Sequence, residues 1–367
     1  MYLYHTTFKN EIVAEFLPPK NLTSKKVIIL CDGLPSMPDK NKLVKFLAKK
    51  NYWVFHMRYR GTWESSGEFL VNSPVQDVLD IIDELSKGFS EVWGGQEFKV
   101  DPESVFVMGA SFGGTTALMS SLDSRIKKVV AICPLVDWKD ESGEESNDYL
   151  KNILRQGYPG SYRFSKENWD KLVKTDFFNP IDYADKFDSS KILSIHAKDD
   201  KIVMYEGVKN FMDKLGCIFL TRKKGGHLSS SIIMKYFIFR KIKKFLDNLK
   251  NMIQSMRLPE EIFEKIKSGQ KTIETRLLDE KRKVLSVGDI IEFAKRPTLH
   301  EKMQVKILDL TTYKTFEEVY DNCDLKDLGY DEKMTKEEYL EKVHHHYDKE
   351  EIKDYEILAI KMEIILK

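Results

Sequence analysis

The sequence predicts an α/β fold over residues 1–250 and a separate α+β unit over residues 251–367. In the first part, short apolar runs alternate with amphipathic segments, a pattern typical of buried strands separated by helices. Strands that are apolar throughout favour a doubly wound, mostly parallel sheet with helices on both faces. The charge also changes, because residues 1–250 carry 38 Lys and Arg against 32 Asp and Glu, and residues 251–367 carry 21 against 26.

The elements of the first part follow in a regular order. The predicted strands are Val27–Cys31, Trp53–Met57, Ser104–Met108, Lys128–Cys133, Ile192–His196 and Cys217–Thr221. The predicted helices are Lys42–Lys50, Val75–Leu85, a segment from Phe112 through Leu122, Val208–Leu215 and Ile232–Leu249. Two N-terminal runs, Tyr2–His5 and Ile12–Phe16, predict an added antiparallel hairpin. Residues 137–187 lack a sheet strand and carry acids and aromatics, which predicts a helical cap that shapes a substrate pocket.

The second part begins with a helix over Leu258–Ser268, because a proline and two glutamates stand at its start and Gly269 follows its end. The predicted strands after it are Thr272–Leu277, Asp289–Phe293, Met303–Leu310 and Tyr355–Ile364. Two acidic helices, Phe316–Tyr320 and Lys336–His345, are expected between the last two strands.

Composition excludes several classes of protein. With 42% hydrophobic and 32% charged residues, the chain can bury a core, and a net charge of +1 excludes polyanion binding through bulk charge. The chain has no run of about 18 apolar residues, so no membrane span is expected, and its first residues show no signal-peptide pattern. The cysteines form no CxxC pair, which favours core residues in a reducing cytoplasm over disulfides or a metal site. They are Cys31, Cys133, Cys217 and Cys323.

A nucleophile elbow is predicted at Gly109-Ala110-Ser111-Phe112-Gly113, because this G-x-S-x-G pattern follows a strand and opens a helix. Gly109 and Gly113 remove side chains that would collide across the sharp turn. The turn projects Ser111 from the sheet and directs the helix N-terminus at it. A developing oxyanion would then meet the Phe112 N–H and the positive end of the helix.

A serine hydroxyl needs a base, and the base needs an orienting acid. Elimination leaves His227 as the base, in a glycine-containing loop after the last short strand. The other histidines precede the expected acid or lie in the second part, and they are His5, His56, His196, His300 and His344–His346. The acid should follow the strand Ile192–His196, where both Asp199 and Asp200 stand.

A second oxyanion donor is expected in the loop after the first long strand. The backbone N–H of Leu34 is the candidate, since Gly33 allows close approach and Pro35 has no N–H. Asp32 stands beside this site and is a candidate for orienting the loop by hydrogen bonding.

Residues 1–250 resemble the α/β-hydrolase superfamily, and within it the prolyl-oligopeptidase-like and dienelactone-hydrolase-like enzymes. The segment Tyr59–Gly67 is similar to their RG…SxG loop, and Phe178–Ile181 also matches. Their acid loop, HGxxDxxV, corresponds to His196–Val203 and implies that Asp200 is the acid. Where these relatives carry His-Gly at the oxyanion loop, this chain carries Asp32 and a glycine.

This resemblance implies a cytoplasmic serine hydrolase in which Ser111, Asp200 and His227 cleave an acyl substrate through an acyl-enzyme. Esterases, thioesterases and peptidases share the fold, so the fold does not name the substrate. No propeller domain precedes the catalytic part, which favours a small acyl ester, amide or thioester over a long peptide. No cofactor or metal is expected, and the oligomeric state is not predicted.

The second part resembles the ASCH domain (activating signal cointegrator homology), a PUA-like β-barrel, over residues 255–365. Its GxKxxExR motif is met at Gly269, Lys271, Glu274 and Arg276. The resemblance implies a cleft for RNA, a nucleotide or a nucleoside, lined by Lys271, Glu274 and Arg276. Some relatives are amidohydrolases with a threonine where Glu274 stands, so that second activity is not expected.

A second hypothesis makes the chain an RNA- or nucleotide-binding module with the hydrolase half as scaffold. The net negative charge of the second part disfavours long nucleic acid, whose binding depends on phosphate neutralisation. A local basic cluster could still hold a short anionic ligand, and it comprises Lys271, Arg276, Lys281, Arg282, Lys283, Lys295 and Arg296. His344–His346 are interpreted as a solvated run, because adjacent helix positions point in different directions.

Overall fold

A computed structural model describes residues 2–140, 142–175, 177–247, 253–279, 281–283, 285–344, 347 and 355–366. The chain divides into two compact units, Met1–Lys235 and Tyr236–Lys367. The boundary predicted from the sequence, between residues 250 and 251, lies outside the described residues. Among the helices in the described ranges, none is long and apolar enough to cross a membrane.

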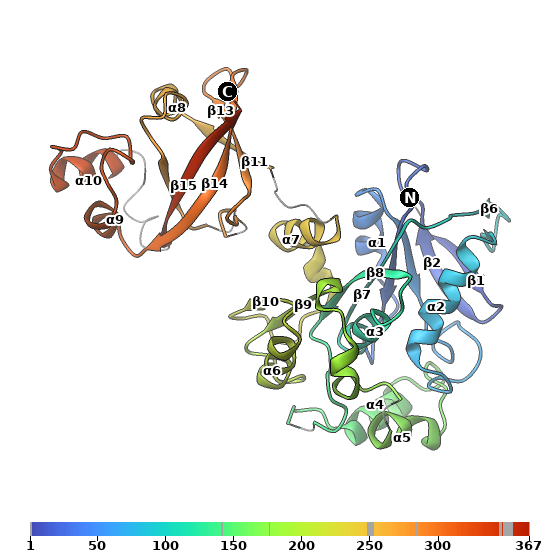
Figure 1. The fold of residues 1–367 in the computed structure, drawn as a ribbon. Coiled ribbons are helices and arrows are strands. Elements are labelled where there is room, and N and C mark those ends of the chain that lie inside the picture. Colours follow the sequence, from blue (N-terminus) through green and yellow to red (C-terminus); the bar gives the residue numbers. More distant parts are fainter. Residues whose placement is uncertain are drawn as a thin grey trace. The chain divides into compact units, whose positions relative to one another are not determined.

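The first unit contains an eight-stranded sheet in the order β1-β2-β4-β3-β7-β8-β9-β10 (Figure 1). Its strands are β1 (Tyr4–Phe8), β2 (Ile12–Leu17), β3 (Lys26–Cys31), β4 (Trp53–Met57), β7 (Ser104–Ala110), β8 (Ile126–Ile132), β9 (Ile192–Ala197) and β10 (Ile218–Arg222). β1 pairs with β2 and β2 with β4 in antiparallel fashion, and the other neighbours are parallel. A small ribbon joins β5 (Phe89–Ser90) to β6 (Glu97–Phe98). The predicted mixed sheet with its N-terminal hairpin is confirmed.

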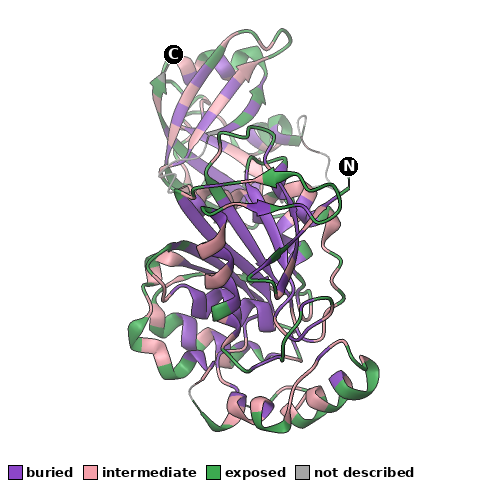
Figure 2. Cartoon of the chain, turned by 90° about the vertical axis from the view of Figure 1, so that its right-hand side faces the viewer, coloured by how far each residue is buried: buried purple, intermediate pink, exposed green. Residues whose placement is uncertain are grey.

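Helices cover both faces of this sheet. All seven residues of β7 and all six of β9 are buried, and consecutive strand residues point to opposite faces, so both faces are covered (Figure 2). The connecting helices are α1 (Asn41–Ala48), α2 (Pro74–Leu85), α3 (Phe112–Ser120) and α6 (Tyr205–Leu215). α3 is buried along its whole length, which fixes the turn that precedes it.

The segment between β8 and β9 forms the predicted cap. It contains α4 (Asn147–Gly157), α5 (Lys166–Lys174), and the 3₁₀ helices η1 (Pro180–Lys186) and η2 (Ser189–Lys191). Ser146 and Ser165 begin α4 and α5 by accepting backbone N–H groups with their side chains. The two helices lie beyond one end of the sheet (Figure 1), and Tyr162 between them pairs with Thr62 in an isolated bridge.

One long predicted helix is shorter in the structure. The interval Ile232–Leu249 begins as a 3₁₀ helix, η3 (Ser230–Met234), and an extended Lys235 then interrupts it before α7 (Tyr236–Leu246). Residues 248 and 249 of that prediction lie outside the described residues. The prediction was wrong because a continuous apolar pattern does not reveal a single extended residue within it.

The second unit contains a five-stranded sheet in the order β11-β13-β14-β15-β12. Its strands are β11 (Ile253–Leu258), β12 (Ile273–Leu277), β13 (Ile290–Lys295), β14 (Lys302–Tyr313) and β15 (Ile357–Leu366), and its helices besides α7 are α8 (Glu260–Lys267), α9 (Phe316–Asn322) and α10 (Lys336–His344). The sheet is curled, so that its two edge strands approach each other. Nη2 of Arg276 on edge strand β12 donates to the Arg257 carbonyl on the other edge strand, β11, at 3.4 Å. This curled sheet confirms the predicted PUA-like architecture.

Candidate active site

The turn between β7 and α3 forces Ser111 into a strained conformation, with φ 57° and ψ −125°. A side chain at Gly109 would place its Cβ 2.2 Å from the Gly113 carbonyl oxygen, and one at Gly113 would lie 2.4 Å from that of Cys31. Only glycine fits at either position. The Ser111 N–H donates to the carbonyl of Ile132 on β8 at 2.8 Å, which anchors the turn to the neighbouring strand.

Asp200 and His227 meet beside this turn. Nδ1 of His227 lies 2.9 Å from Oδ2 of Asp200, whose side chain is fully buried. The backbone N–H groups of Ile202 and Val203 donate to Oδ1 of Asp200 at 3.0 and 3.1 Å. Burial alone would raise the pKa of Asp200, but the His227 contact and the Val203 N–H hold that pKa below its ordinary value.

Asp199, the alternative acid, contacts the backbone of the loop that carries His227 and not its imidazole. It is exposed, and its carboxylate accepts the N–H groups of Gly225 and Gly226 at 3.2 and 2.9 Å. It therefore braces the loop that carries His227 and does not touch the imidazole. The structure brings Asp200, not Asp199, into contact with His227.

Ser111 makes no hydrogen bond to Asp200 or His227. β7, β8 and β9 are parallel neighbours, and the residues after their carboxyl ends are Ser111, Cys133 and the acid loop. The Cys133 N–H donates to the Ile195 carbonyl at 2.8 Å, and its thiol bonds to Asp200. Neither Oγ of Ser111 nor Nε2 of His227 hydrogen-bonds to a described residue. Catalytic contacts of this kind often tighten only when substrate binds.

The two predicted oxyanion donors flank the nucleophile. Phe112 is the first residue of α3, so its N–H has no acceptor within the helix. The loop with Leu34 packs on the elbow, because a Cβ on Gly33 would lie 3.5 Å from Cβ of Ser111. The Leu34 N–H makes no hydrogen bond to another described residue.

Asp32, for which the sequence suggested only a loop-orienting role, is the centre of a buried charge network. Its carboxylate lies 2.9 Å from Nε2 of His56 and 2.6 Å from Nζ of Lys40, and it accepts the Ser36 hydroxyl at 3.4 Å. Its carbonyl accepts the hydroxyl of Tyr59 at 3.1 Å. Burial alone would raise the pKa of Asp32, but His56 and Lys40 hold it far below its ordinary value. Both ends of Asp32 are thus held, immediately before the oxyanion loop.

The network continues along the sheet to its second strand. Nδ1 of His56 lies 3.3 Å from Oε2 of Glu15, and that oxygen also pairs with Arg58 at 3.1 Å. On the other side, the hydroxyl of Tyr162 in the cap accepts the Ser36 N–H at 3.0 Å. These contacts fix the loop between the sheet and the cap.

Replacing Asp32 with asparagine is expected to lower the free energy of unfolding by about 3–5 kcal/mol near neutral pH, because the Lys40 ammonium loses its buried counter-charge and His56 loses its carboxylate partner. A carboxylate whose pKa is lower in the folded state than in the unfolded state stabilises the folded state fully at pH values above its unfolded-state pKa, which is about 4. This stabilisation is lost progressively as the pH falls from there through the folded-state pKa. The difference between wild type and D32N should therefore narrow below about pH 4. Urea unfolding at several pH values measures it.

The matched control is Asp39→Asn, an exposed acid of the same loop. It should change stability by less than about 0.5 kcal/mol. A difference between wild type and D32N that stays constant down to about pH 3 would contradict the role assigned to the Asp32 carboxylate.

One group of described residues has ligand atoms close enough for a metal: Cys133, His196 and Asp200, within 4.8 Å of one another. Burial raises the pKa of the Cys133 thiol, which disfavours the thiolate that a metal requires. Nε2 of His196 is bound to the Val203 carbonyl at 2.9 Å. Cys133 and His196 are therefore better suited to hold Asp200 in place than to bind a metal ion.

The three residues predicted to line a nucleotide cleft form a buried ion-paired chain. Lys271 and Glu274 are buried, with Nζ 3.4 Å from Oε2, and Nη2 of Arg276 lies 2.8 Å from Oε1 of Glu274. Nζ of Lys271 also donates to the Leu328 carbonyl at 2.8 Å, and burial lowers its pKa. Lys271 and Arg276 line two different cavities, and Glu274 lines neither. An RNA or nucleotide ligand stays a prediction, and His345 and His346 lie outside the described residues.

Comparison with known families gives two matches. The model of the prolyl oligopeptidase family matches residues 39–246, and that of the ASCH domain matches residues 256–365. Comparison with curated proteins gives no match.

Comparison with solved structures also gives matches. The Pyrococcus furiosus esterase Pf2001 is 17% identical, with a TM-score of 0.50, over 67% of this chain and 89% of that one. DcsB, solved with a substrate analogue, is 15% identical, with a TM-score of 0.51, over 67% and 98%. Hypothetical protein PH0355 is 34% identical over 31% of this chain and 100% of that chain, with a TM-score of 0.27. At their low identities, the first two show the α/β-hydrolase fold alone.

The family match spans more than half of the chain and includes the elbow, the acid loop and His227. Both predicted resemblances are confirmed. The chain belongs to the prolyl oligopeptidase family of serine hydrolases and carries an ASCH domain after the catalytic unit.

Proposed function

We propose that the chain hydrolyses a small acyl ester, or the related amide or thioester, with Ser111, His227 and Asp200 as its catalytic triad. The observation that carries this proposal is the 2.9 Å contact between Nδ1 of His227 and the buried Asp200 carboxylate, beside a serine held at φ 57°. Strain of that kind is retained where a function requires it.

In the first step, Oγ of Ser111 attacks the acyl carbonyl while Nε2 of His227 accepts its proton. Asp200 keeps the proton of Nδ1 in place and stabilises the imidazolium that forms. The backbone N–H groups of Phe112 and Leu34 hold the oxyanion. His227 then protonates the leaving group, and water, activated by the same imidazole, cleaves the acyl-enzyme.

The way in which the cap is attached favours a small substrate over a large one. Tyr162 hydrogen-bonds both to the N–H and to the carbonyl of Ser36, at 3.0 and 3.3 Å, so the cap is fastened to the oxyanion loop. A substrate that reaches the oxyanion donors must fit beside this contact. A short acyl chain meets that condition more easily than a peptide does.

A series of p-nitrophenyl esters from acetate to decanoate, measured beside acylated amino-acid p-nitroanilides, tests this function. Acetate and butyrate should give the highest kcat/KM, and the decanoate ester should be slower by about tenfold or more, since transition-state binding decides between substrates. An anilide that is hydrolysed faster than every ester would exclude the ester assignment. Inert esters and anilides together would exclude the proposal.

A further inference from the structure

A second candidate site lies in the ASCH domain, at the seam where edge strands β11 and β12 approach. The cavity there has a volume of about 480 Å³, within the range of small-molecule sites. Its lining residues are Gln254, Ser255, Met256, Arg257, Arg276, Lys281, Arg282 and Arg296. Five of these eight residues are cationic and none is acidic. We call this cavity the arginine pocket.

Arginine is concentrated here and nowhere else in this part of the sequence. Residues 251–367 contain four arginines and 17 lysines. All four arginines line the arginine pocket, whereas Lys281 is the only lysine among the lining residues. A guanidinium presents a planar pair of donors that matches a phosphate in a bidentate way, which an ammonium cannot do. The choice of residue therefore indicates recognition of phosphate and not positive charge alone.

The charges of the pocket are only partly neutralised. Arg276 pairs with Glu274, and Arg282 pairs with Asp279. Arg257, Lys281 and Arg296 form no ion pair with any residue in the described ranges. Three uncompensated cations around one cavity repel one another, and a multiply charged anion removes that repulsion.

Three polar atoms of the lining are buried without a hydrogen-bond partner. They are Nε of Arg276, Nε of Arg282 and Oε1 of Gln254. The Gln254 side chain is held by its amide nitrogen, which donates to the Lys281 carbonyl at 3.1 Å, and the residue is only 7% exposed. Such atoms are costly to leave unpaired and mark the place of a missing partner. The two guanidinium groups need an oxygen acceptor, and Gln254 needs a donor such as a hydroxyl.

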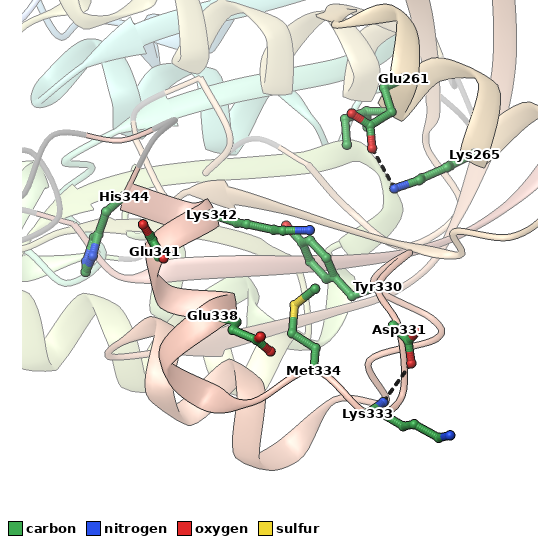
Figure 3. A pocket seen from close by; sticks show the side chains of 11 residues that line it. Glu261, Lys265, Tyr330, Asp331, Lys333, Met334, Glu338, Glu341, Lys342 and His344 are labelled. Carbon is green, nitrogen blue, oxygen red and sulfur yellow. Dashed lines mark hydrogen bonds and ion pairs between the residues drawn. The ribbon is translucent and has the colours of Figure 1, made fainter.

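A larger cavity of this unit differs from the arginine pocket in the charge of its lining. It measures about 1120 Å³, and its charged lining residues have both signs (Figure 3). Glu261 and Lys265 pair with each other at 2.7 Å across its wall (Figure 3). Carboxylates there would repel a phosphate. Of these two cavities, only the arginine pocket has a lining suited to an anion.

We propose that the arginine pocket binds the di- or triphosphate group of a small molecule. RNA is less well matched, because residues 251–367 carry more acids than bases and no aromatic side chain lines the pocket to stack on a base. The ligand is recognised by its phosphates, and a hydroxyl of the ligand satisfies Gln254. This proposal does not depend on the hydrolase activity.

Calorimetric titration of the full-length chain at about 50 mM NaCl, where phosphate contacts are strong, tests the proposal with four probes. They are tripolyphosphate, orthophosphate, ATP and a ten-nucleotide single-stranded RNA. Tripolyphosphate and ATP should bind, and tripolyphosphate should bind about tenfold more tightly than orthophosphate, because it engages several guanidinium groups. The RNA should bind more weakly than tripolyphosphate at the same salt concentration.

Variants of the two exposed arginines locate the site without disturbing the buried chain of Glu274. Arg257→Gln and Arg296→Gln should each raise the Kd for tripolyphosphate about fivefold or more, and Arg296→Lys should retain only part of the affinity. Lys314→Gln is the control, since it removes one exposed charge of the same unit outside the pocket. It should change the Kd less than about twofold.

Three results would overturn the proposal. One is the absence of heat from tripolyphosphate and ATP, with the melting curve showing a folded chain. Another is an equal loss of affinity in the Lys314 and Arg296 variants, which would mean non-specific charge attraction. The third is RNA binding that R296Q weakens while tripolyphosphate fails to bind, which would assign the pocket to the RNA backbone.

Discussion

Ser111→Ala is expected to lower kcat for the best ester substrate by about 10⁴- to 10⁶-fold. In the proposed mechanism, alanine removes the nucleophile and leaves no hydroxyl for His227 to activate. The oxyanion donors of Phe112 and Leu34 remain, so a small rate above that in water should persist. KM should change little, because the hydroxyl contributes little to ground-state binding. Steady-state kinetics of the purified variant measures both constants.

The matched control for this variant is Ser121→Ala, at the end of the same helix. Its hydroxyl donates to the Leu118 carbonyl at 2.7 Å and lies away from the elbow. The kcat of this variant should stay within about twofold of the wild-type value, although its free energy of unfolding should fall by about 1 kcal/mol. A fluorophosphonate probe should label wild type and S121A and leave S111A unlabelled. Equal labelling of S111A would contradict the assignment of the nucleophile.

The elbow could be predicted from the sequence because its constraint is local. The carbonyl oxygen of Gly113 would lie 2.2 Å from a Cβ on Gly109, so the steric demand appears as two glycines at a fixed spacing. His227 could be inferred from chain order. Asp199 and Asp200 could not be separated by the residues alone, since both follow β9, and only the resemblance favoured Asp200. Asp200 is buried and Asp199 is exposed, and this difference depends on how the chain turns after β9.

The charge network around Asp32 was beyond sequence reasoning for a different reason. Its members come from β2 and β4, from the residue after β3 and from the residue before α1, and no spacing rule links Glu15, His56 and Lys40. Only the sheet order, which places β4 between β2 and β3, brings them together.

Strand β11 was missed because it does not look like a buried strand. Its inward series runs Gln254, Met256 and Leu258, with Arg257 between them, and a helix start follows directly at Pro259. The missed strand is one wall of the arginine pocket. The predicted cleft therefore lacked the residues that β11 contributes, and of its three predicted residues Lys271 and Arg276 line two different cavities while Glu274 lines neither.

Asp200→Asn should lower kcat by about 10³- to 10⁴-fold, whereas Asp199→Asn should lower it by about tenfold or less. An amide at residue 200 can donate to Nδ1 of His227, which moves the imidazole proton to Nε2. In the proposed mechanism Nε2 must accept the Ser111 proton, so the variant loses its base. The Asp199 carboxylate accepts the N–H groups of Gly225 and Gly226 with separate oxygens, and in D199N one amide oxygen still accepts one of them, so the histidine loop should be only partly loosened.

The pH profile separates these roles further. Because the pKa of Asp200 lies below its ordinary value, this carboxylate is already ionised above about pH 4. Between about pH 5 and pH 7 the wild-type profile should therefore contain no titration of the Asp200 carboxylate. D199N should keep that profile, and D200N should lose rate at every pH in the interval. A D199N variant as inactive as D200N, with both folded, would transfer the role of the acid or show that the loop around Gly225 governs the geometry of the base.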